Sequence, residues 1–487
     1  MTKALLFTGE SGQFRYYREV IARLKHEGVQ VALCCDRGDP GIRELMADAS
    51  RELEVPFYYH DGDSELPMMT RQEKLYEKLF FFRLRFLTRF RKCIGHLPRA
   101  ALFHMIRFHR YRLSAAKKII RESGADIIVV PEDGIGGNYW AVEAAARLGV
   151  PSAVLPFGMG DSSSLIYKGI EEKFSDGSLC LADSEEGAVI KEIWPQWVND
   201  TAYGEALFLP PAFVAGMELT GISLPQPWVM HGGNASAILV EGTEMQSRYR
   251  KEGVREGKMV LAGSVYTDIL HDGLMRFSGD DRVIREFRRH APDNLRVLVC
   301  VPPNESSHWR QQSEFEHISD YCTRLRHFAE ELGNVTLDFS LHPRTLPQDI
   351  EILERNGIRG LPDSAIKLIP AYDVVITSLS SVSRWALVCA RPVIDFDMFG
   401  FKKIDFPDVA GFLYCLRFGE VLAQLKRLHD DDQYYTECSR GCLPIMQGFE
   451  PVDGKAVRNI ARRLEQIVAG TANDVSQSQA LDTAGSK

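Results

Sequence analysis

Ile127-Ile128-Val129-Val130 is followed at once by Pro131-Glu132-Asp133-Gly134, and this stretch decides the fold. The four apolar, β-branched residues favour a strand buried on both faces, as in a parallel sheet. A helical segment is expected next, from about Tyr139 to Leu148. Ligands of open α/β sheets bind at the carboxyl ends of the strands. The stretch therefore predicts both a sheet and a site at its edge.

The same alternation of short apolar runs and amphipathic helices extends in both directions. In the first half of the chain, strands are expected at Ala4–Thr8, Val29–Cys34, Pro56–His60, Ser152–Leu155, Ala237–Val240 and Met259–Ala262. The pattern then restarts, with strands at Leu295–Val301, Val335–Leu341, Val374–Thr377 and Pro392–Phe396. Two such series predict an α/β protein with two doubly wound, Rossmann-like domains.

Composition shifts along the chain predict the domain boundaries. We expect an N-terminal domain at 1–275, with a helical insertion at about 71–121, and a C-terminal domain at 293–450. A linker at 276–292 joins the two domains, and a helix at 451–469 follows the second. The small and polar residues 470–487 are expected to form a disordered tail.

Composition also excludes several classes of protein. The chain has 487 residues, of which 45% are hydrophobic and 25% charged, as in soluble globular proteins. A net charge of -8 argues against nucleic-acid binding. No signal peptide or membrane span is visible, and the 10 cysteines show no metal-ligand spacing, so a reduced, cytoplasmic protein without a metal site is expected.

The acidic pair Glu132-Asp133 is the first candidate for catalysis. A carboxylate at a strand end suits a general base that takes a proton from an acceptor hydroxyl. The alternative is structural: Asp133 caps the next helix and Glu132 is solvated.

Two further motifs follow strands in the second series. His342-Pro343-Arg344 comes after Val335–Leu341, where His342 can donate a hydrogen bond to a phosphate and Arg344 can add charge. Thr377-Ser378-Leu379-Ser380-Ser381 precedes a helix, where its hydroxyls and amides suit phosphate binding. A backbone-bonded histidine at a turn and a serine N-cap are the structural alternatives. Asn304 and Ser306, in the segment after Leu295–Val301, are further donor-site candidates.

Glu10-Ser11-Gly12 follows the first strand and is the candidate for the acceptor side of the site. An ordinary strand-to-helix turn would have the same sequence. Because the stretch is not G-x-G-x-x-G, a dinucleotide cofactor is not expected.

Taken in order, the acidic pair, His342-Pro343 and Ser380-Ser381 resemble three signatures of bacterial sialyltransferases and polysialyltransferases of the GT-B fold. The segments around His342, Ser380 and Arg391-Pro392 are also similar to the CDP-glycerol glycerophosphotransferases and related capsule and wall-polymer transferases. The segment from Glu241 to Ser264 resembles one in nucleotide-sugar 2-epimerases.

This resemblance implies two Rossmann-like domains whose parallel sheets face a central cleft, and an inverting, metal-independent glycosyltransferase. Asp133 would be the general base with Glu132 beside it, and His342, Ser380 and Ser381 would bind the donor phosphate. The nucleotide sugar would be a substrate, no cofactor would be needed, and the acceptor would be a surface glycan, a glycolipid or other lipid-linked glycan, or a glycoprotein.

The sequence departs from these families in two places, and each departure bears on the expected function. Many UDP-sugar enzymes of this fold carry an acidic residue shortly after the serine-rich turn, whereas this chain reads Val382-Ser383-Arg384-Trp385. A CMP-linked acidic sugar is therefore the first choice, with a CDP-polyol or UDP-sugar donor as the alternative. The epimerases carry Glu-Ala-Gly where this chain reads Pro156-Phe157-Gly158, which counts against epimerisation, the other alternative.

The insertion is basic and aromatic. From Leu79 to Arg121 there is no acidic residue and about a dozen Lys and Arg. These cations either extend outward from helices packed on their own domain, or they form a surface for an anionic membrane or a lipid-linked acceptor. The second alternative predicts a peripheral protein at the inner face of the cell membrane.

Overall fold

The computed structural model describes residues 1–36, 40–59, 79, 96–158, 162–279, 282–303, 313–342, 344–449 and 451–470. The chain divides into two compact units. The first unit comprises Met1–Val240, Gln246–Leu261 and the chain from Ile460, and the second comprises Glu241–Met245 and Ala262–Asn459. Each unit contains its own parallel sheet, so the predicted α/β class with two Rossmann-like domains is confirmed.

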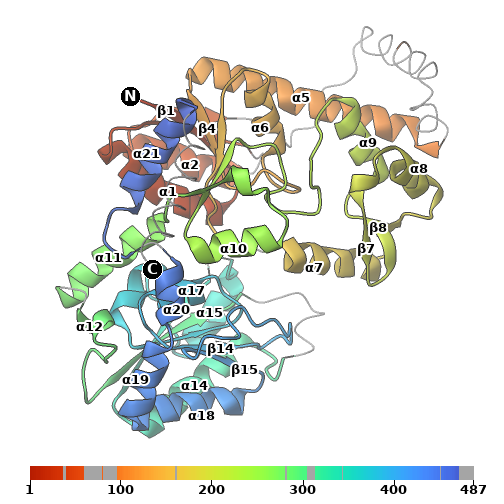
Figure 1. Ribbon diagram of the computed structural model, residues 1–487. Helices are drawn as coiled ribbons and strands as arrows, with labels where there is room; N and C mark the ends of the chain where they lie inside the picture. The colour runs from red at the N-terminus through yellow and green to blue at the C-terminus, as the bar shows by residue number, and fades with distance from the viewer. Residues whose placement is uncertain are drawn as a thin grey trace, which may run out of the picture. The chain divides into compact units, whose positions relative to one another are not determined.

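The first unit is built on a seven-stranded parallel sheet in the order β10-β9-β5-β4-β1-β2-β3 (Figure 1). Its strands are β1 (Lys3–Thr8), β2 (Gln30–Cys35), β3 (Phe57–Tyr59), β4 (Ile127–Val130), β5 (Ser152–Val154), β9 (Ala237–Val240) and β10 (Met259–Leu261). β1 and β4 are neighbours, with Leu5 paired to Ile128. Both strands are almost completely buried, as their continuous apolar runs predict.

Helices cover this sheet and extend beyond it. They are α1 (Ser11–His26), α2 (Pro40–Glu52), α5 (Arg99–Ser123), α6 (Tyr139–Ala146), α7 (Ser162–Ser175), α8 (Glu185–Ile193), α9 (Pro211–Leu219) and α10 (Thr243–Lys251), with 3₁₀ turns at Pro195–Trp197 and Glu256–Lys258. α5 packs on α6 and α9. Its left-handed C-cap is Gly124, at φ 59°.

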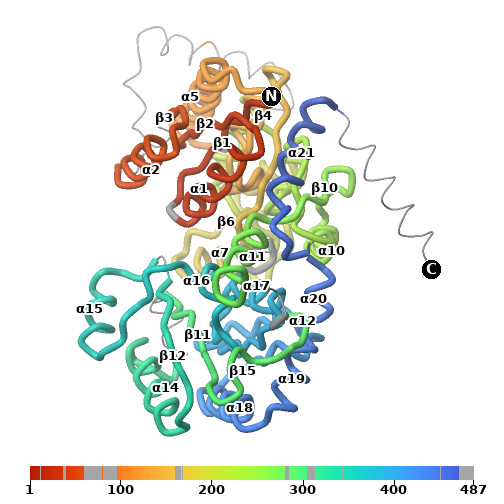
Figure 2. Tube along the Cα trace, turned by 90° about the vertical axis from the view of Figure 1, so that its left-hand side faces the viewer, coloured from red at the N-terminus to blue at the C-terminus, as the bar shows by residue number. Residues whose placement is uncertain are grey.

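The last helix, α21 (Ala456–Val468), lies beside β10 (Figure 2). Arg463 Nε donates to the carbonyl of Leu261, 202 positions earlier in the chain. The chain therefore returns to the first unit after completing the second.

A small antiparallel sheet in the first unit was not expected from the sequence. It has the order β6-β8-β7 and consists of β6 (Cys180–Leu181), β7 (Val198–Thr201) and β8 (Gly204–Leu207). Two of its strands carry exposed polar residues, so they lack the continuous apolar runs that mark the parallel strands.

The second unit contains a five-stranded parallel sheet in the order β12-β11-β13-β14-β15. Its strands are β11 (Leu295–Val301), β12 (Val335–Leu341), β13 (Val374–Thr377), β14 (Val393–Phe396) and β15 (Phe412–Cys415). The first four agree with the predicted strands to within a residue, and β15 was not predicted.

Figure 1 shows α14 and α18 on one side of this sheet and α17 on the other. The helices are α11 (Val265–Ser278), α12 (Arg282–Arg285), α14 (Ile318–Leu332), α15 (Pro347–Arg355), α16 (Ala365–Leu368), α17 (Val382–Val388), α18 (Phe418–Asp430), α19 (Asp432–Arg440) and α20 (Leu443–Gly448), with a 3₁₀ turn at Ile369–Ala371. Apolar side chains of β11, β13, β14, α14 and α18 form one core.

Part of the predicted organisation lies outside the described residues. This applies to 71–78 and 80–95 of the basic-aromatic insertion and to the expected tail from residue 471. Among the described residues, no helix is both long enough and apolar enough to cross a membrane.

Candidate donor and acceptor sites

Each parallel sheet has a point where the strand order reverses, and ligands of doubly wound folds bind there. In the first unit the chain proceeds outward through β1, β2 and β3, then restarts at β4 on the other side of β1. The turns after β1 and β4 therefore lie at the reversal. These turns carry Glu10-Ser11-Gly12 and Glu132-Asp133, so the fold brings the predicted acceptor-side and catalytic residues to neighbouring strand ends.

Asp133 is completely buried and has a structural partner. Its Oδ2 accepts hydrogen bonds from Lys258 Nζ at 2.6 Å and from the Ala235 backbone N–H at 2.8 Å. Lys258 Nζ also donates to the carbonyls of His231 and Gly233, at 2.8 and 2.9 Å. A carboxylate held by a buried ammonium inside the fold is poorly placed to receive a proton from a substrate.

Burial dominates the electrostatics around this ion pair. It lowers the pKa of Lys258, and the charge of Asp133 acts in the opposite direction. Burial also lowers the pKa of the neighbouring His231 to about 4, so that imidazole is neutral at physiological pH.

Close backbone packing explains the glycines around the acidic pair. Gly134 N–H donates to the carbonyl of Met230 at 3.0 Å. A Cβ added at Gly233 would lie 1.9 Å from the carbonyl oxygen of Asp133, and one at Gly137 would lie 2.7 Å from the backbone of Glu132. These contacts fix the turn on which Glu132 stands.

Glu132 is partly exposed, and its charge acts on the same tyrosine as that of Asp36, a carboxylate that sequence reasoning missed. Burial raises the pKa of Tyr17 well above its usual value, and the charges of both Glu132 and Asp36 add to this effect. Tyr17 Oη donates to the carbonyl of Leu155 at 3.1 Å. The charges of two carboxylates at neighbouring strand ends therefore both act on the Tyr17 phenol. Asp36 directly follows β2, so the strand-end rule could have found it.

Asp36 is held by contacts from distant parts of the chain. Asn138 Nδ2 donates to its Oδ2, and Arg112 of α5 contacts its backbone carbonyl at 3.4 Å. The Arg112 guanidinium also lies 4.5 Å from the ring centre of Trp140, a cation–π contact. Neither Asn138 nor Arg112 carries a signal in the sequence, because only tertiary packing brings them to β2.

The predicted acceptor-side turn begins α1. Glu10 occupies the N-cap position with an extended backbone, φ −122°, and makes no side-chain cap hydrogen bond. Gly12 is exposed, and an added Cβ there would meet nothing within 4 Å. For Ser11 the structure describes the backbone alone. This turn is open at the point where β1 meets β4.

In the second unit the strand order reverses between β11 and β13. Ser378, Ser380 and Ser381 follow β13, and His342 and Arg344 follow β12, on the other side of β11. All three strands are parallel, so these residues lie at one edge of the sheet. Asn304 and Ser306, expected in the segment after β11, lie outside the described residues.

His342 is half-buried and its ring is oriented by the backbone. The Arg344 backbone N–H donates to His342 Nδ1 at 3.1 Å. In the neutral imidazole the proton is then on Nε2, which makes that atom a donor. Arg344 itself is exposed. The backbone hydrogen bond uses only Nδ1 of His342, so this histidine can stabilise the turn and still offer Nε2 to a phosphate.

The serine turn after β13 has an unusual backbone. Leu379 has φ +44°, in the left-handed region that residues other than Gly, Asn and Asp seldom adopt. The hydroxyl oxygen of Ser378 is buried and, within the described part of the chain, has no hydrogen-bond partner. Ser380 Oγ accepts the N–H of Val382 at 3.3 Å, so it acts in part as the predicted helix-start serine.

Arg384, in the stretch after the serine turn that lacks an acidic residue, is buried inside the second unit. Its guanidinium makes two contacts with the Glu241 carboxylate, at 2.7 and 3.0 Å, and both side chains are almost completely buried. Ser264 Oγ contacts the same carboxylate at 3.3 Å. Arg384 therefore has a structural partner and is not directed at a nucleotide.

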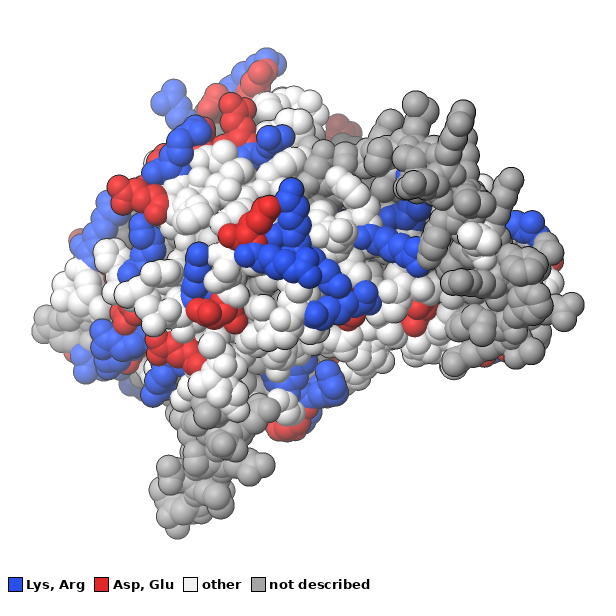
Figure 3. Space-filling view, turned by 90° about the horizontal axis from the view of Figure 1, so that it is seen from above, with Lys and Arg blue, Asp and Glu red and all other residues white. Residues whose placement is uncertain are grey.

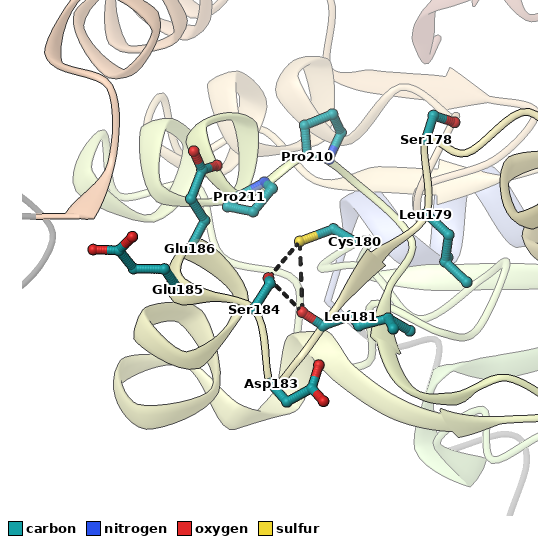
Figure 4. A pocket seen from close by; sticks show the side chains of 10 residues that line it. All are labelled: Ser178, Leu179, Cys180, Leu181, Asp183, Ser184, Glu185, Glu186, Pro210 and Pro211. Carbon is teal, nitrogen blue, oxygen red and sulfur yellow. Dashed lines mark hydrogen bonds between the residues drawn. The ribbon is translucent and has the colours of Figure 1, made fainter.

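A depression of about 560 Å³ lies beside the small antiparallel sheet (Figure 4). Its lining is Ser178, Leu179, Cys180, Leu181, Asp183, Ser184, Glu185, Glu186, Pro210 and Pro211. Ser184 Oγ donates to the carbonyl of Leu181 at 2.6 Å and lies 3.5 Å from Cys180 Sγ. None of these residues follows a strand of either parallel sheet, so the depression is separate from both candidate sites.

Comparisons with known proteins identify the fold. No family model and no curated protein matches the chain. Among solved structures, a putative UDP-N-acetylglucosamine 2-epimerase from Listeria monocytogenes matches with a TM-score of 0.51 and 13% identity, over 96% of each chain. The calicheamicin glycosyltransferase CalG4 matches with a TM-score of 0.52 and 13% identity, over 96% of this chain and 98% of that one. The chain has the GT-B fold. At this identity the likeness shows the fold alone.

Proposed function

We propose that this protein is an inverting, metal-independent glycosyltransferase that uses a nucleotide-activated sugar. The observation that carries the proposal is the edge of the second sheet. There, His342, whose Nδ1 accepts a backbone N–H, and Ser378, whose buried hydroxyl has no hydrogen-bond partner among the described residues, follow strands on either side of β11. Donors at the reversal point of a doubly wound sheet suit a phosphate group.

The chemistry requires one group to accept a proton and others to stabilise a leaving phosphate. The acceptor oxygen attacks the anomeric carbon, its proton passes to a carboxylate, and the bond from that carbon to the phosphate oxygen breaks. The nucleotide leaves with the bonding electrons, and donors from His342, Ser378 and Ser380 stabilise the negative charge. No redox partner is needed.

We assign the general base to Glu132 and not, as the sequence favoured, to Asp133. Glu132 is partly exposed at the reversal point of the first sheet, whereas Asp133 is buried and ion-paired with Lys258. Asp133 would then hold the turn in place. Glu10, Ser11 and Gly12, at the neighbouring strand end, remain our candidates for binding the acceptor.

For the donor we retain a CMP-linked acidic sugar as first choice, because Val382-Ser383-Arg384-Trp385 lacks the acidic residue expected for a UDP sugar and its Arg384 is paired with Glu241. The experiment is a thermal-shift and hydrolysis screen of CMP-, CDP-, UDP- and GDP-linked donors. Selective stabilisation by one nucleotide series supports the proposal, and no response to any of them contradicts it.

The alternative is a nucleotide-sugar 2-epimerase, the activity named for the structure from Listeria monocytogenes. Incubation of UDP-N-acetylglucosamine without an acceptor, followed by NMR, distinguishes the two. Epimerisation at C2 would replace the transferase proposal.

Removing the His342 side chain is expected to weaken binding of the nucleotide product by about one to two orders of magnitude, since a hydrogen bond to a charged group contributes roughly 1.5–3 kcal/mol. Calorimetric titration of His342→Ala with the nucleotide found in the screen measures this. The matched control is His327→Ala, an exposed histidine on α14. Equal affinity in wild type and His342→Ala would remove His342 from the donor site.

We further propose that the outer face of α5 binds an anionic membrane surface, where a lipid-linked acceptor would be found. Seen from above in Figure 3, Lys and Arg side chains form a row over the region of α5. Leu102, Ile106 and Leu113 face the protein core, whereas the exposed or half-exposed side chains include Arg107, Arg110, Lys117, Lys118 and Arg121. The one acidic residue of α5 is Glu122. A cationic helix face of this kind suits anionic lipid headgroups.

Sedimentation with vesicles containing anionic lipid tests this surface. Wild type is expected to pellet at low salt and to be released at high salt, because salt screens the attraction. Replacing Arg107, Arg110, Lys118 and Arg121 with Gln should keep the protein in the supernatant. The control variant loses the same number of positive charges from the second unit. It carries Gln in place of Arg355, Arg359, Lys426 and Arg440. Wild type that never pellets, or equal loss in both variants, would contradict the proposal.

A further inference from the structure

Two buried acidic residues lie at the end of β14: Asp395 is on the strand and Asp397 directly follows it, and they are 1% and 2% exposed. Each holds a loop that contains a left-handed residue other than glycine. Asp397 accepts the backbone N–H groups of Phe401 and Lys402, at 2.9 and 2.6 Å, and Lys402 has φ +54°. The two carboxylates are therefore occupied separately by backbone groups.

Asp395 holds the serine turn of the proposed donor site. Its Oδ1 accepts hydrogen bonds from Thr377 Oγ1 at 2.7 Å and from the backbone N–H of Leu379 at 3.1 Å. Leu379 is the residue at φ +44°, a conformation that persists only where surrounding contacts impose it. The carboxylate supplies one such contact at the strained residue itself.

The contacts of Asp395 continue to the serines. Thr377 Oγ1 lies 3.1 Å from Ser383 Oγ, which donates to the carbonyl of Ser380 at 2.7 Å. Ser378 and Ser380 are the two neighbours of Leu379 in sequence. The backbone conformation at Leu379 therefore determines the directions in which both hydroxyls project.

Among the described residues Asp395 forms no ion pair with a cation, and the neighbouring charges of Asp405 and Asp397 are acidic. Burial raises its pKa to about 6, and Asp405 and Asp397 act in the same direction, while the hydrogen bonds from Thr377 and Leu379 oppose them. Tyr321 of α14 and Tyr414 and Cys415 of β15 also face it.

The sign of the resulting stability effect follows from the raised pKa. Folding favours the protonated form, so this group contributes stability that is present below its usual value of 3.8 and is lost as pH rises through about 6. At neutral pH the fold therefore retains an ionised carboxylate at a cost in stability. A group with that property, bonded to a strained residue, is typical of functional sites.

We propose that ionised Asp395 is a positioning residue of the donor-phosphate site, which holds Leu379 in its left-handed conformation so that Ser378 and Ser380 can bind phosphate. This inference rests on the proposed function, since it assigns the serine turn to the donor. Protonation weakens the two hydrogen bonds that Asp395 accepts, because a charged acceptor binds more strongly than a neutral one.

The test is calorimetric titration of wild type, Asp395→Asn and Asp397→Asn with CMP and with UDP, at pH 8 and at pH 5. Asparagine keeps the acceptor oxygen and removes the charge. At pH 8, Asp395→Asn is expected to bind about tenfold more weakly than wild type. At pH 5 the two should differ by less than about twofold, since wild type is then protonated.

Comparing the two proteins at each pH cancels the titration of the nucleotide phosphate, which is the same ligand in both titrations. The matched control, Asp397→Asn, removes the buried carboxylate two residues after Asp395 and should show no such pH-dependent ratio. The thermal midpoint of Asp395→Asn relative to wild type should be higher at pH 8 than at pH 5. If Asp395→Asn does not fold, Thr377→Val removes one of the two hydrogen bonds to the same oxygen and is expected to weaken binding at pH 8.

The outcomes separate this inference from the proposed function. Wild type that binds neither nucleotide at either pH overturns the donor-site proposal itself. Wild type that binds nucleotide, with Asp395→Asn equal to it at both pH values, overturns the role of Asp395 and leaves the donor site in place. If Asp395→Asn loses the same amount of nucleotide affinity at pH 5 and at pH 8, Asp395 has a structural role that does not depend on its charge. This result also overturns the inference.

Discussion

Replacing Glu132 with Gln is expected to slow sugar transfer by about a hundred- to ten-thousand-fold, the usual cost of removing a general base. Glutamine keeps the shape of the side chain and loses the ability to accept a proton. Nucleotide affinity should stay within a few-fold of wild type, because the proposed phosphate-binding residues follow strands of the other sheet. The measurement is kcat with the donor found in the screen, together with product-nucleotide affinity by calorimetry.

A second carboxylate serves as the control. Asp36→Asn alters the other acidic residue whose charge acts on Tyr17. The rate of sugar transfer by Asp36→Asn should still rise with pH as in wild type, whereas Glu132→Gln should lose this rise. Wild-type turnover in Glu132→Gln would refute the assignment. A loss of turnover restricted to Asp133→Asn, in a protein that remains folded, would return the role to the residue that the sequence favoured.

Replacing Lys258 with Met is expected to destabilise the first unit by about 3–5 kcal/mol, because it leaves the Asp133 carboxylate buried without its cation. Methionine has a similar length and fills the same space. Denaturant unfolding followed by hydrogen exchange at β4 and β9 measures the loss within that unit. The double variant Lys258→Met with Asp133→Asn should be more stable than Lys258→Met alone, since no buried charge remains.

Arg250→Met is the matched control for an ion pair at the surface. Arg250 contacts Glu256, and both side chains are more than half exposed. Its loss should leave the unfolding transition unchanged, because solvent screens such pairs. If Lys258→Met unfolds at the same denaturant concentration as wild type, the Asp133 carboxyl must move or become neutral in the variant. That result would weaken the argument against Asp133 as the general base.

Sequence patterns were sufficient to predict the two parallel sheets. β1, β4, β9, β11 and β13 are buried on both faces, so their residues form continuous apolar runs that are visible without a structure. The small antiparallel sheet was missed because its residues are exposed in part and follow no such pattern. β15 was missed although Phe412–Cys415 is a short apolar run. The same strand-end rule that predicted Glu132, His342 and Ser380 also applies to Asp36.

What the sequence by itself determined is the class of fold, the order of the parallel strands along the chain and the motifs at their carboxyl ends, since these depend on local runs of residues. Tertiary structure alone decided that Asp133 is buried in an ion pair whereas Glu132 is partly exposed. Lys258, 125 positions after Asp133, neutralises one carboxylate and leaves the other partly exposed. It also decided that Asp395 meets Leu379, 16 positions away, across the neighbouring strands β13 and β14. Contacts between residues distant in sequence set burial and charge, and no local pattern encodes them.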